Sequence, residues 1–274
     1  MAQLILAATP IGNLGDISVR LRDALESASH ILAEDTRHTR KLLNHLGISR
    51  PLRSFHAHSS ERDFAAVTEL LMGAGTVVYV SDAGMPGISD PGFELVQLAH
   101  QHDLEVDVLP GPSAGVTALL LSGLPPVPHM FVGFIPRTQS GRTQLLQNLT
   151  RWPMTAIAYE SPHRLSTTLA HLARFAGETP IAVCRELTKL HQEVIRGSAL
   201  EIAARTDPWR GEIVLVLGAL EQQLNEPDIP SSYAQLREAG MRHSQALRQL
   251  ASEHRLTKRE IARIIQSTST DDDG

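Results

Sequence analysis

Two clusters of charged side chains contain groups that could move a proton or bind an anion. The first cluster follows the apolar run HILA and consists of Glu34, Asp35, Arg37 and His38. The second follows the run IAVC and consists of Arg185, Glu186 and Lys189. Arginine and lysine can hold phosphate groups, and either Asp35 or Lys189 could take the proton of a weakly acidic hydroxyl. An equally weighted alternative is that the clusters form structural ion pairs near a domain or dimer interface, Glu34 with Arg37 and Arg185 with Glu186.

Histidine and cysteine give weaker indications of chemistry. His56 and His58 stand two positions apart without a cysteine or acidic companion, so the sequence predicts no metal site. His56 follows a predicted strand and is instead a candidate for a catalytic role near the substrate. The single cysteine, Cys184, cannot form an internal disulfide, and its apolar neighbours favour a buried structural thiol over a nucleophile.

Three loops rich in glycine, proline and polar side chains each follow a predicted strand. Loop 1 is ATPIGNLGD (residues 8–16), loop 2 is SDAGMPGISDPG (residues 81–92) and loop 3 is LPGPSAG (residues 109–115). Glycine lets the backbone approach a ligand closely, and ligands of open α/β sheets bind beyond the carboxyl ends of the strands. The common nucleotide motifs G-x-G-x-x-G and G-x-x-x-x-G-K-[ST] are not matched. Together the loops predict a ligand-binding cleft of another kind, in which Ser113 caps the helix after loop 3.

The elements that must position these loops alternate between strand and helix. Apolar runs predict strands at 4–8, 76–81 and 106–110, and helical spacing predicts helices at 17–28, 37–46 and 93–101. Such alternation argues for a mostly parallel sheet covered on both faces. It resumes after the proline-rich segment 123–129, with the strand-like runs FVGF, MTAIAYE, PIAVC, QEVIR and EIVLVLG and helices at 141–150, 163–175 and 198–205. The predicted fold class is α/β, with one α/β domain over residues 1–118 and a second over residues 119–222.

The C-terminal part of the chain is predicted to form a small helical unit. The polar segment LNEPDIPSS (224–232) predicts a linker. Residues 244–254 have helical spacing, and Thr257 with Glu260 forms a T-x-x-E capping box that opens another helix. Two short helices with a tight turn suggest a helix-turn-helix-like element. The predicted boundaries are 230–267 for this unit and 268–274 for a disordered tail.

Composition and charge limit the class of protein. The chain of 274 residues has a formal net charge of −5, and no apolar stretch reaches the roughly 18 residues of a membrane helix. With one cysteine and no basic leader, it is expected to be cytoplasmic, with no membrane partner. RNA binding would depend on local charge, since segments 34–53 and 244–266 each hold five basic and two acidic residues. Only 4% of residues are aromatic, which favours a structured ribosomal particle over free single strands.

A set of motifs spread over residues 4–266 resembles the tetrapyrrole-methylase-like class of S-adenosylmethionine methyltransferases. Within that class they are similar to the bacterial small-subunit rRNA (cytidine-2′-O-)-methyltransferases. The motifs are TPIGNLGD, AEDTRHTRKLL, SDAGMPGISDPG, LPGPSA, YESPHR, RELTK and RGEIVLVL. The resemblance implies two α/β domains with a cofactor cleft between them, S-adenosyl-L-methionine as cofactor, and a homodimer. It also implies methylation of a cytidine ribose 2′-hydroxyl in the decoding region of 16S rRNA, with the small ribosomal subunit as partner.

The resemblance further implies which residues contact the cofactor. They are Pro10 in loop 1, Ser81, Asp82, Ala83 and Ile88 in loop 2, Ser113 and Ala114 in loop 3, and Tyr159, Glu160, Gly211 and Glu212 in the second domain. The candidate catalytic residues are Asp35, Arg37, His56 and Lys189. Met85 departs from the family pattern, which has threonine there, and a methionine can pack but cannot donate a hydrogen bond.

Three other functions stay open at this point. A precorrin-type tetrapyrrole methylase would share the fold and cofactor, but the C-terminal helical unit and the AEDTRHT cluster argue against it. A methylase that acts on a protein side chain is a second alternative. The third is a non-enzymatic, nucleic-acid-binding regulator with a ligand-sensing α/β body, against which the three loops and the full second domain argue.

Overall fold

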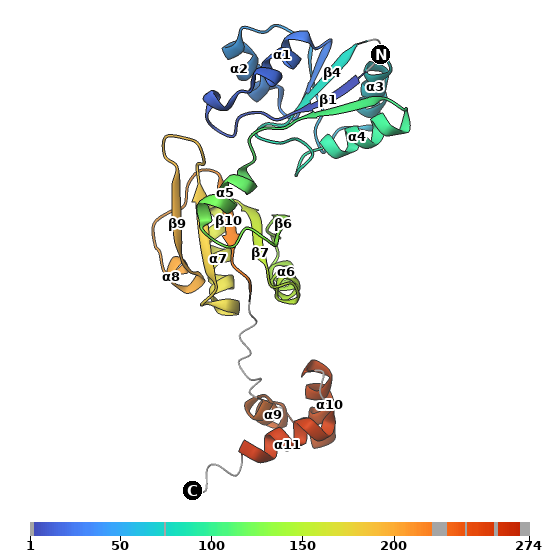
Figure 1. Ribbon diagram of the computed structural model, residues 1–274. Helices are drawn as coiled ribbons and strands as arrows, with labels where there is room; N and C mark the ends of the chain where they lie inside the picture. Colours follow the sequence, from blue (N-terminus) through green and yellow to red (C-terminus); the bar gives the residue numbers. More distant parts are fainter. Residues whose placement is uncertain (1–2, 74, 221–228, 239, 255–256, 269–274) are drawn as a thin grey trace. The chain divides into compact units, whose positions relative to one another are not determined.

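The computed structural model describes residues 3–73, 75–220, 229–238, 240–254 and 257–268. The chain divides into two compact units, residues 1–221 and residues 222–274, which are described separately (Figure 1). The first unit contains two five-stranded sheets with helices packed on them, so the predicted α/β class is confirmed. The division of this unit into domains 1–118 and 119–222 stays a prediction.

The N-terminal sheet is parallel in every pairing of its strands. It consists of β1 (Gln3–Ala7), β2 (His30–Ala33), β3 (Leu52–Ser54), β4 (Thr76–Val80) and β5 (Glu105–Leu109), in the order β3-β2-β4-β1-β5. Parallel strands present their carboxyl ends at one edge of a sheet. Loops 1, 2 and 3 follow β1, β4 and β5, which are neighbours, so the three loops meet at that edge.

Different helices cover the two faces of the N-terminal sheet. Helices α1 (Val19–Ser27) and α2 (Thr36–Leu46) pack on one face, and α3 (Glu61–Met72) and α4 (Gly92–Gln101) pack on the other. In β4, Val78 and Val80 join the first core, whereas Val77 and Tyr79 join the second. Successive side chains of a strand point to opposite faces, so this central strand must be apolar at consecutive positions.

The C-terminal sheet is mixed, and the expectation of parallel strands is wrong there. Its order is β6-β7-β10-β8-β9, formed by β6 (His129–Phe134), β7 (Thr155–Glu160), β8 (Pro180–Arg185), β9 (Glu193–Ser198) and β10 (Ile213–Leu217). Only β6 and β7 pair in parallel among these strands, and the other pairings are antiparallel. The connection 186–192 between β8 and β9 is too short for the crossover that a parallel pair requires.

Helices also cover both faces of the C-terminal sheet. Helix α5 (Ala114–Ser122) packs on one face through Ala118 and Leu119, which contact the core around Ile157 and Val214. Helices α6 (Gln139–Arg151), α7 (Pro162–Ala176) and α8 (Ala199–Ala203) share a core with the other face. Loop 3 therefore leads directly from the N-terminal sheet into a helix that belongs by packing to the C-terminal sheet.

The second unit contains three helices in its described part, one more than the sequence predicted. They are α9 (Ile229–Glu238), α10 (His243–His254) and α11 (Lys258–Thr268). Helix α9 begins inside the predicted linker 224–232, because proline is tolerated in the first turn of a helix. Ile229, Leu247, Leu250 and Ile261 form its buried core. The capping box is confirmed, since Glu260 N donates to Thr257 Oγ1 at 3.3 Å and Thr257 N to Glu260 Oε2 at 2.7 Å.

Two predictions about the C-terminal region concern residues that the structure does not describe. Residues 224–228 of the predicted linker and 269–274 of the predicted tail lie outside the described part of the chain. Within that part, no helix is both long and apolar enough to cross a membrane.

Candidate active site

Backbone hydrogen bonds hold the three loops together at the carboxyl edge of the N-terminal sheet. Thr9 and Gly84 join loops 1 and 2 through two N–H···O bonds of 3.0 and 3.1 Å, and Ala8 N donates to Leu109 O at 3.1 Å. Gly84 has a φ of +81°, and a Cβ there would lie 3.0 Å from Ile11 Cγ2. Glycine is required at this position because both the left-handed backbone and the close approach exclude a side chain.

Asp90 holds loop 2 in its folded shape. Its carboxylate accepts hydrogen bonds from Gly87 N and Gly92 N at 2.9 Å each and from the Tyr79 hydroxyl at 3.1 Å. Sequence reasoning assigned no role to Asp90 or to Ser89, although both border the cavity described next. Met85 is half-buried and borders neither that cavity nor the second cavity described below. Its departure from the family pattern therefore lies away from both cavities.

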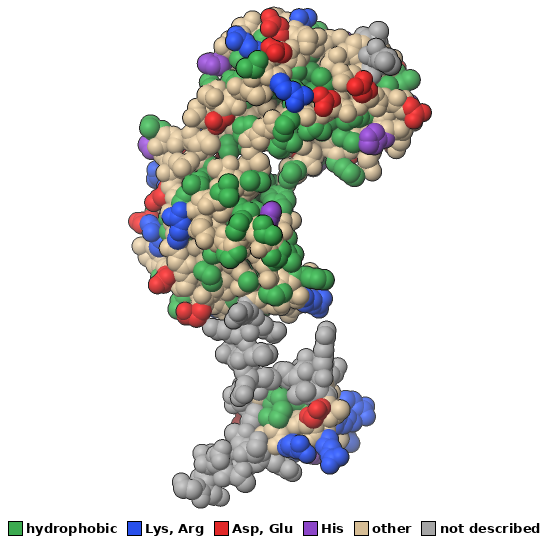
Figure 2. All heavy atoms as spheres, in the orientation of Figure 1, with side chains coloured by type: hydrophobic (Ala, Val, Ile, Leu, Met, Phe, Trp, Pro, Cys, Tyr) green, Lys and Arg blue, Asp and Glu red, His purple; other side chains and the backbone are tan. Residues whose placement is uncertain are grey.

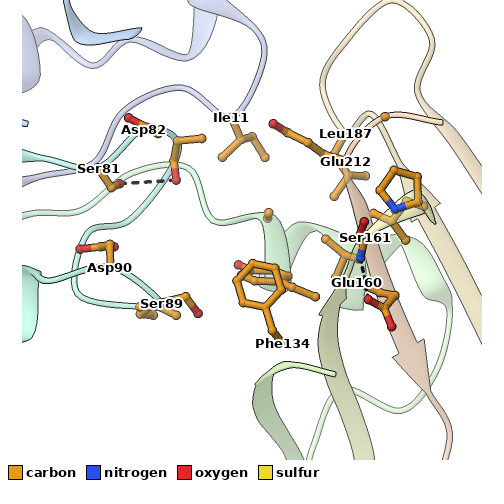
Figure 3. A pocket seen from close by; sticks show the side chains of 18 of the residues that line it. Ile11, Ser81, Asp82, Ser89, Asp90, Phe134, Glu160, Ser161, Leu187 and Glu212 are labelled. Carbon is orange, nitrogen blue, oxygen red and sulfur yellow. Dashed lines mark hydrogen bonds between the residues drawn. The ribbon is translucent and has the colours of Figure 1, made fainter. Parts of the chain in front are cut away.

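The first cavity has a volume of about 410 Å³ and lies between loop 2 and the C-terminal sheet (Figure 3). Figure 3 shows Ser81, Asp82 and Asp90 on one side, Glu160 and Ser161 on the other, and Ile11 and Phe134 between them. Most of the predicted cofactor residues border it, namely Ser81, Asp82, Ala83, Ile88, Ala114, Tyr159, Glu160, Gly211 and Glu212. The volume is within the range of about 300–1,000 Å³ that is usual for small-molecule sites.

Two predicted cofactor residues lie elsewhere. Pro10 borders a second cavity of about 370 Å³, which shares Ile11, Asp82 and Glu212 with the first. Ser113 borders neither cavity. It does occupy the N-cap position of α5, but its side chain makes no capping hydrogen bond, so that part of the prediction is wrong.

Glu160 borders the first cavity, but its carboxylate is already engaged by other residues of the protein. Its side chain is 0% exposed and pairs with Arg164 at 2.5 Å. Glu160 also accepts hydrogen bonds from Ser161 N at 2.7 Å and from the Thr168 hydroxyl at 2.6 Å. These bonds anchor the start of α7 and leave the backbone of Glu160 as the part that can contact a ligand.

The first charged cluster is organised around Asp35 and Asp82. Asp35 caps α2 and is paired with Arg37, and hydrogen bonds from the Arg37 side chain hold the pKa of Asp35 well below its usual range. The predicted pair of Glu34 with Arg37 does not form. Asp82 Oδ1 accepts from Asp35 N at 2.9 Å, and Asp82 Oδ2 lies 3.3 Å from His38 Nδ1. Loop 2 is thereby tied to the start of α2.

Burial and neighbouring charges both affect the pKa of Glu34, the remaining acid of the first charged cluster. Burial raises the pKa of Glu34, and repulsion from Asp82 and Asp90 adds to the effect. Glu34 Oε2 accepts a hydrogen bond from Asp82 N at 3.3 Å, which opposes the rise in pKa. Burial likewise raises the pKa of Tyr159 on the opposite wall.

The second charged cluster is also paired differently from the prediction. Arg185 pairs with Glu193 at 2.8 Å rather than with Glu186. Lys189 Nζ lies 2.8 Å from Glu186 Oε1 and 3.1 Å from Glu212 Oε2. Burial lowers the pKa of Lys189, but the bonds to Glu186 and Glu212 outweigh burial and raise the pKa overall. Lys189 is therefore a cation at neutral pH and not a proton acceptor.

The histidines His56 and His38 lie in different surroundings. His56 is exposed beyond the edge strand β3, accepts a bond from His58 N at 3.2 Å, and borders neither cavity. Asp35, His38 and Asp82 each place one possible ligand atom within 4.8 Å of the others. Asp35 is already paired with Arg37, and Asp82 already accepts a hydrogen bond from Asp35 N and contacts His38, so both carboxylates have partners within the protein.

Comparison with known proteins defines the class to which this fold and cavity belong. The sequence profile of the Tetrapyrrole (Corrin/Porphyrin) Methylases matches residues 3–203, and the chain belongs to this family. It is a methyltransferase that uses S-adenosylmethionine.

Relatives within the family match nearly the whole chain. Two proteins named Ribosomal RNA small subunit methyltransferase I, from Halalkalibacterium halodurans and Synechocystis sp., are each 40% identical to it. The matches cover 95% and 99% of this chain and 93% and 100% of the relatives. A relative of the same name from Thermotoga maritima is 42% identical over 81% of this chain and 100% of its own length.

Solved structures agree with the fold. A diphthine synthase superimposes with a TM-score of 0.64 at 14% identity, over 79% of this chain and 90% of that one. A uroporphyrin-III-C-methyltransferase from Thermus thermophilus gives 0.57 at 18% identity, over 81% and 96%.

Proposed function

We propose that the enzyme methylates a cytidine ribose 2′-hydroxyl in small-subunit rRNA. The observation that carries this proposal is the match, over nearly the whole chain, to proteins named Ribosomal RNA small subunit methyltransferase I. That name specifies the RNA and not the methylated atom, so the 2′-hydroxyl rests on the resemblance of the sequence motifs. A ribosomal substrate would place the enzyme in the cytoplasm.

The first cavity is proposed to bind S-adenosyl-L-methionine, whose sulfonium supplies the electrophilic methyl group. Its apolar walls, including Ile11, Phe134 and Leu187, suit an adenine ring. The carboxylates of Asp82 and Glu212 border the same space and suit a cationic ligand. Ala83 and Ser89 of loop 2 and Gly211 border it with small side chains or none, so many contacts could be made to the backbone and would not depend on side-chain identity.

Catalysis by this chain is proposed to depend on positioning and on a fixed cation. A ribose hydroxyl is a weak nucleophile, so correct alignment and stabilisation of the developing negative charge lower the barrier. Lys189 is the candidate for charge stabilisation because Glu186 and Glu212 hold its ammonium at the second cavity, and Glu212 also borders the first. Asp35 and Arg37 are proposed to position α2 and loop 2. His56 borders neither cavity, so no step is assigned to it.

A homodimer is proposed, and an exposed apolar face supports it. Val116 and Leu120 on α5 are 52% and 69% exposed, and Phe131 on β6 is 39% exposed. Figure 2 shows hydrophobic side chains gathered over α5 and β6. Large contiguous apolar patches on a protein surface commonly mark an interface.

The helical unit is proposed to bind rRNA phosphates. Its described residues include the exposed side chains of Arg237, Arg242, Arg248, Lys258, Arg259 and Arg263, and Figure 2 shows basic side chains gathered on this unit. Such a surface suits sequence-independent contacts that position RNA.

A labelling experiment tests the proposed acceptor. The protein and S-adenosylmethionine with a labelled methyl group are incubated separately with unmodified small ribosomal subunits, naked 16S rRNA, a precorrin and total cell protein. We expect label in the rRNA of the subunits. Label that entered only the precorrin or the protein fraction would contradict the proposal, and absence of label from every acceptor would favour the non-enzymatic regulator.

A further inference from the structure

The second cavity adjoins the first but differs from it in charge. Ile11, Asp82 and Glu212 border both cavities, whereas Lys41 and Lys189 border only the second. The shared wall means that a molecule in the second cavity would lie directly beside the contents of the first. The volume of about 370 Å³ is within the range for a small-molecule or nucleotide site.

Lys41 supplies an unpaired positive charge at this cavity. It is exposed on α2, and no carboxylate of the described residues lies within 4.0 Å of its ammonium or of the neighbouring Arg40. Between Thr36 and Leu46, helix α2 carries three Lys or Arg residues and no acidic residue. Arg37 is paired with Asp35, so Arg40 and Lys41 remain free to attract an anion.

Lys189 supplies a second positive charge, held firmly in the wall. Loop 1 lies against its stem, because a Cβ at Gly12 would overlap the Lys189 side chain. Glu186 and Glu212 accept two of the three hydrogen bonds that its ammonium can donate. One donor is left for a ligand in the second cavity.

We propose that the second cavity receives the acceptor nucleotide, with Lys41 binding the RNA phosphate beside the ribose. The remaining Lys189 donor faces the hydroxyl of that ribose. This inference rests on the proposed rRNA function and adds the place of the acceptor and the residues that hold it. Phosphate contacts of this kind fix the register of RNA without reading its sequence.

Kinetics of the full-length enzyme on small ribosomal subunits test the inference. Lys41→Glu is expected to raise KM for the subunit about tenfold or more, because a charge-assisted phosphate contact is replaced by repulsion. Lys41→Gln should raise KM less. Neither change should alter the dissociation constant of S-adenosylmethionine, measured by calorimetric titration, by more than about twofold, because Lys41 does not border the first cavity.

Arg22→Glu is the matched control because it makes the same change of charge. Arg22 is exposed on α1 and borders neither cavity. If the wild-type enzyme methylates rRNA but Lys41→Glu and Arg22→Glu have the same KM for the subunit, this inference is overturned and the proposed function stands. The inference would also be overturned if Lys41→Glu weakened the binding of S-adenosylmethionine by the same factor as it raised KM for the subunit. Failure of the wild-type enzyme to label any rRNA would remove the proposed function and this inference together.

Discussion

At the scale of single residues, the structure separates the candidate catalytic side chains by what already binds them. Asp35 is held by Arg37, and its depressed pKa makes it a poor proton acceptor at neutral pH. Lys189 is kept charged by two glutamates and can stabilise an anion. His56 lies outside both cavities. The charge of Lys189 is therefore the property most worth testing.

Replacing Lys189 with alanine is expected to lower kcat about 100-fold, the usual loss when one group that stabilises developing charge is removed. Lys189→Arg should retain part of the activity because it keeps the charge. Asp35→Asn should cost less than about tenfold, since asparagine keeps the cap of α2. Single-turnover methylation measures these rates, and calorimetric titration checks that the cofactor still binds. Full activity of Lys189→Ala would remove this lysine from the mechanism.

Gly84 of loop 2 is expected to tolerate alanine poorly. Its φ is +81° and a Cβ would lie 3.0 Å from Ile11 and 3.2 Å from the Pro112 carbonyl. Gly47 has a φ of +69° with open space around it, so Gly47→Ala reports the backbone cost alone, about 1 kcal/mol. Gly84→Ala should lower the free energy of unfolding by about 1–3 kcal/mol more. Equal losses in urea unfolding would show that loops 1 and 2 do not pack as described.

The sequence predicted which residues carry charge in the site but not which residues they pair with. Arg37 pairs with Asp35 instead of Glu34, and Arg185 with Glu193 instead of Glu186. Pairing depends on where a side chain points once the strands have packed, and chain order does not determine that. Glu193 could be found only after β8 and β9 were known to be antiparallel neighbours, which places it opposite Arg185.

At the scale of elements, most strands and helices were predictable because their apolar spacing is regular. The N-terminal sheet follows from strand and helix alternation, and the helices predicted at 17–28, 37–46 and 93–101 correspond to α1, α2 and α4. The antiparallel pairings of the C-terminal sheet were missed because pattern alone does not give strand direction. Helix α9 was missed because Pro230 and the serines after it resemble a linker.

Helix α5 is the element on which the proposed dimer can be tested. Leu120→Glu puts a charge on its exposed face and is expected to halve the molar mass measured by light scattering, with little change in thermal stability because the side chain is 69% exposed. Met72→Glu, at a residue of α3 that is 55% exposed, is the control and should leave the mass unchanged. A dimeric Leu120→Glu protein would exclude this face as the interface.

At the scale of the whole molecule, charge is divided unevenly along the chain. The segment 229–268 holds seven of the 25 Lys and Arg residues and three of the 30 Asp and Glu residues, although the chain is net negative. We therefore expect the helical unit to add affinity for RNA rather than chemistry.

Reversing two charges on α11 tests that expectation. Arg259→Glu with Arg263→Glu should raise KM for small subunits and leave kcat nearly unchanged. The slope of log affinity against log salt should fall by about one for each phosphate that the variant no longer neutralises. Arg151→Glu with Arg174→Glu, also exposed, is the control double variant. A fall in kcat at saturating subunit would contradict a role limited to binding.

The most direct test of the central claim is the position of the transferred methyl group in rRNA. Small subunits labelled by the wild-type enzyme are extracted, and their 16S rRNA is hydrolysed in alkali, which cannot cleave beside a 2′-O-methyl ribose. We predict that the label is recovered in an alkali-resistant dinucleotide whose 5′ nucleoside is cytidine. Label recovered in mononucleotides would place the methyl group on a base and would contradict the assignment of a ribose 2′-hydroxyl as the acceptor.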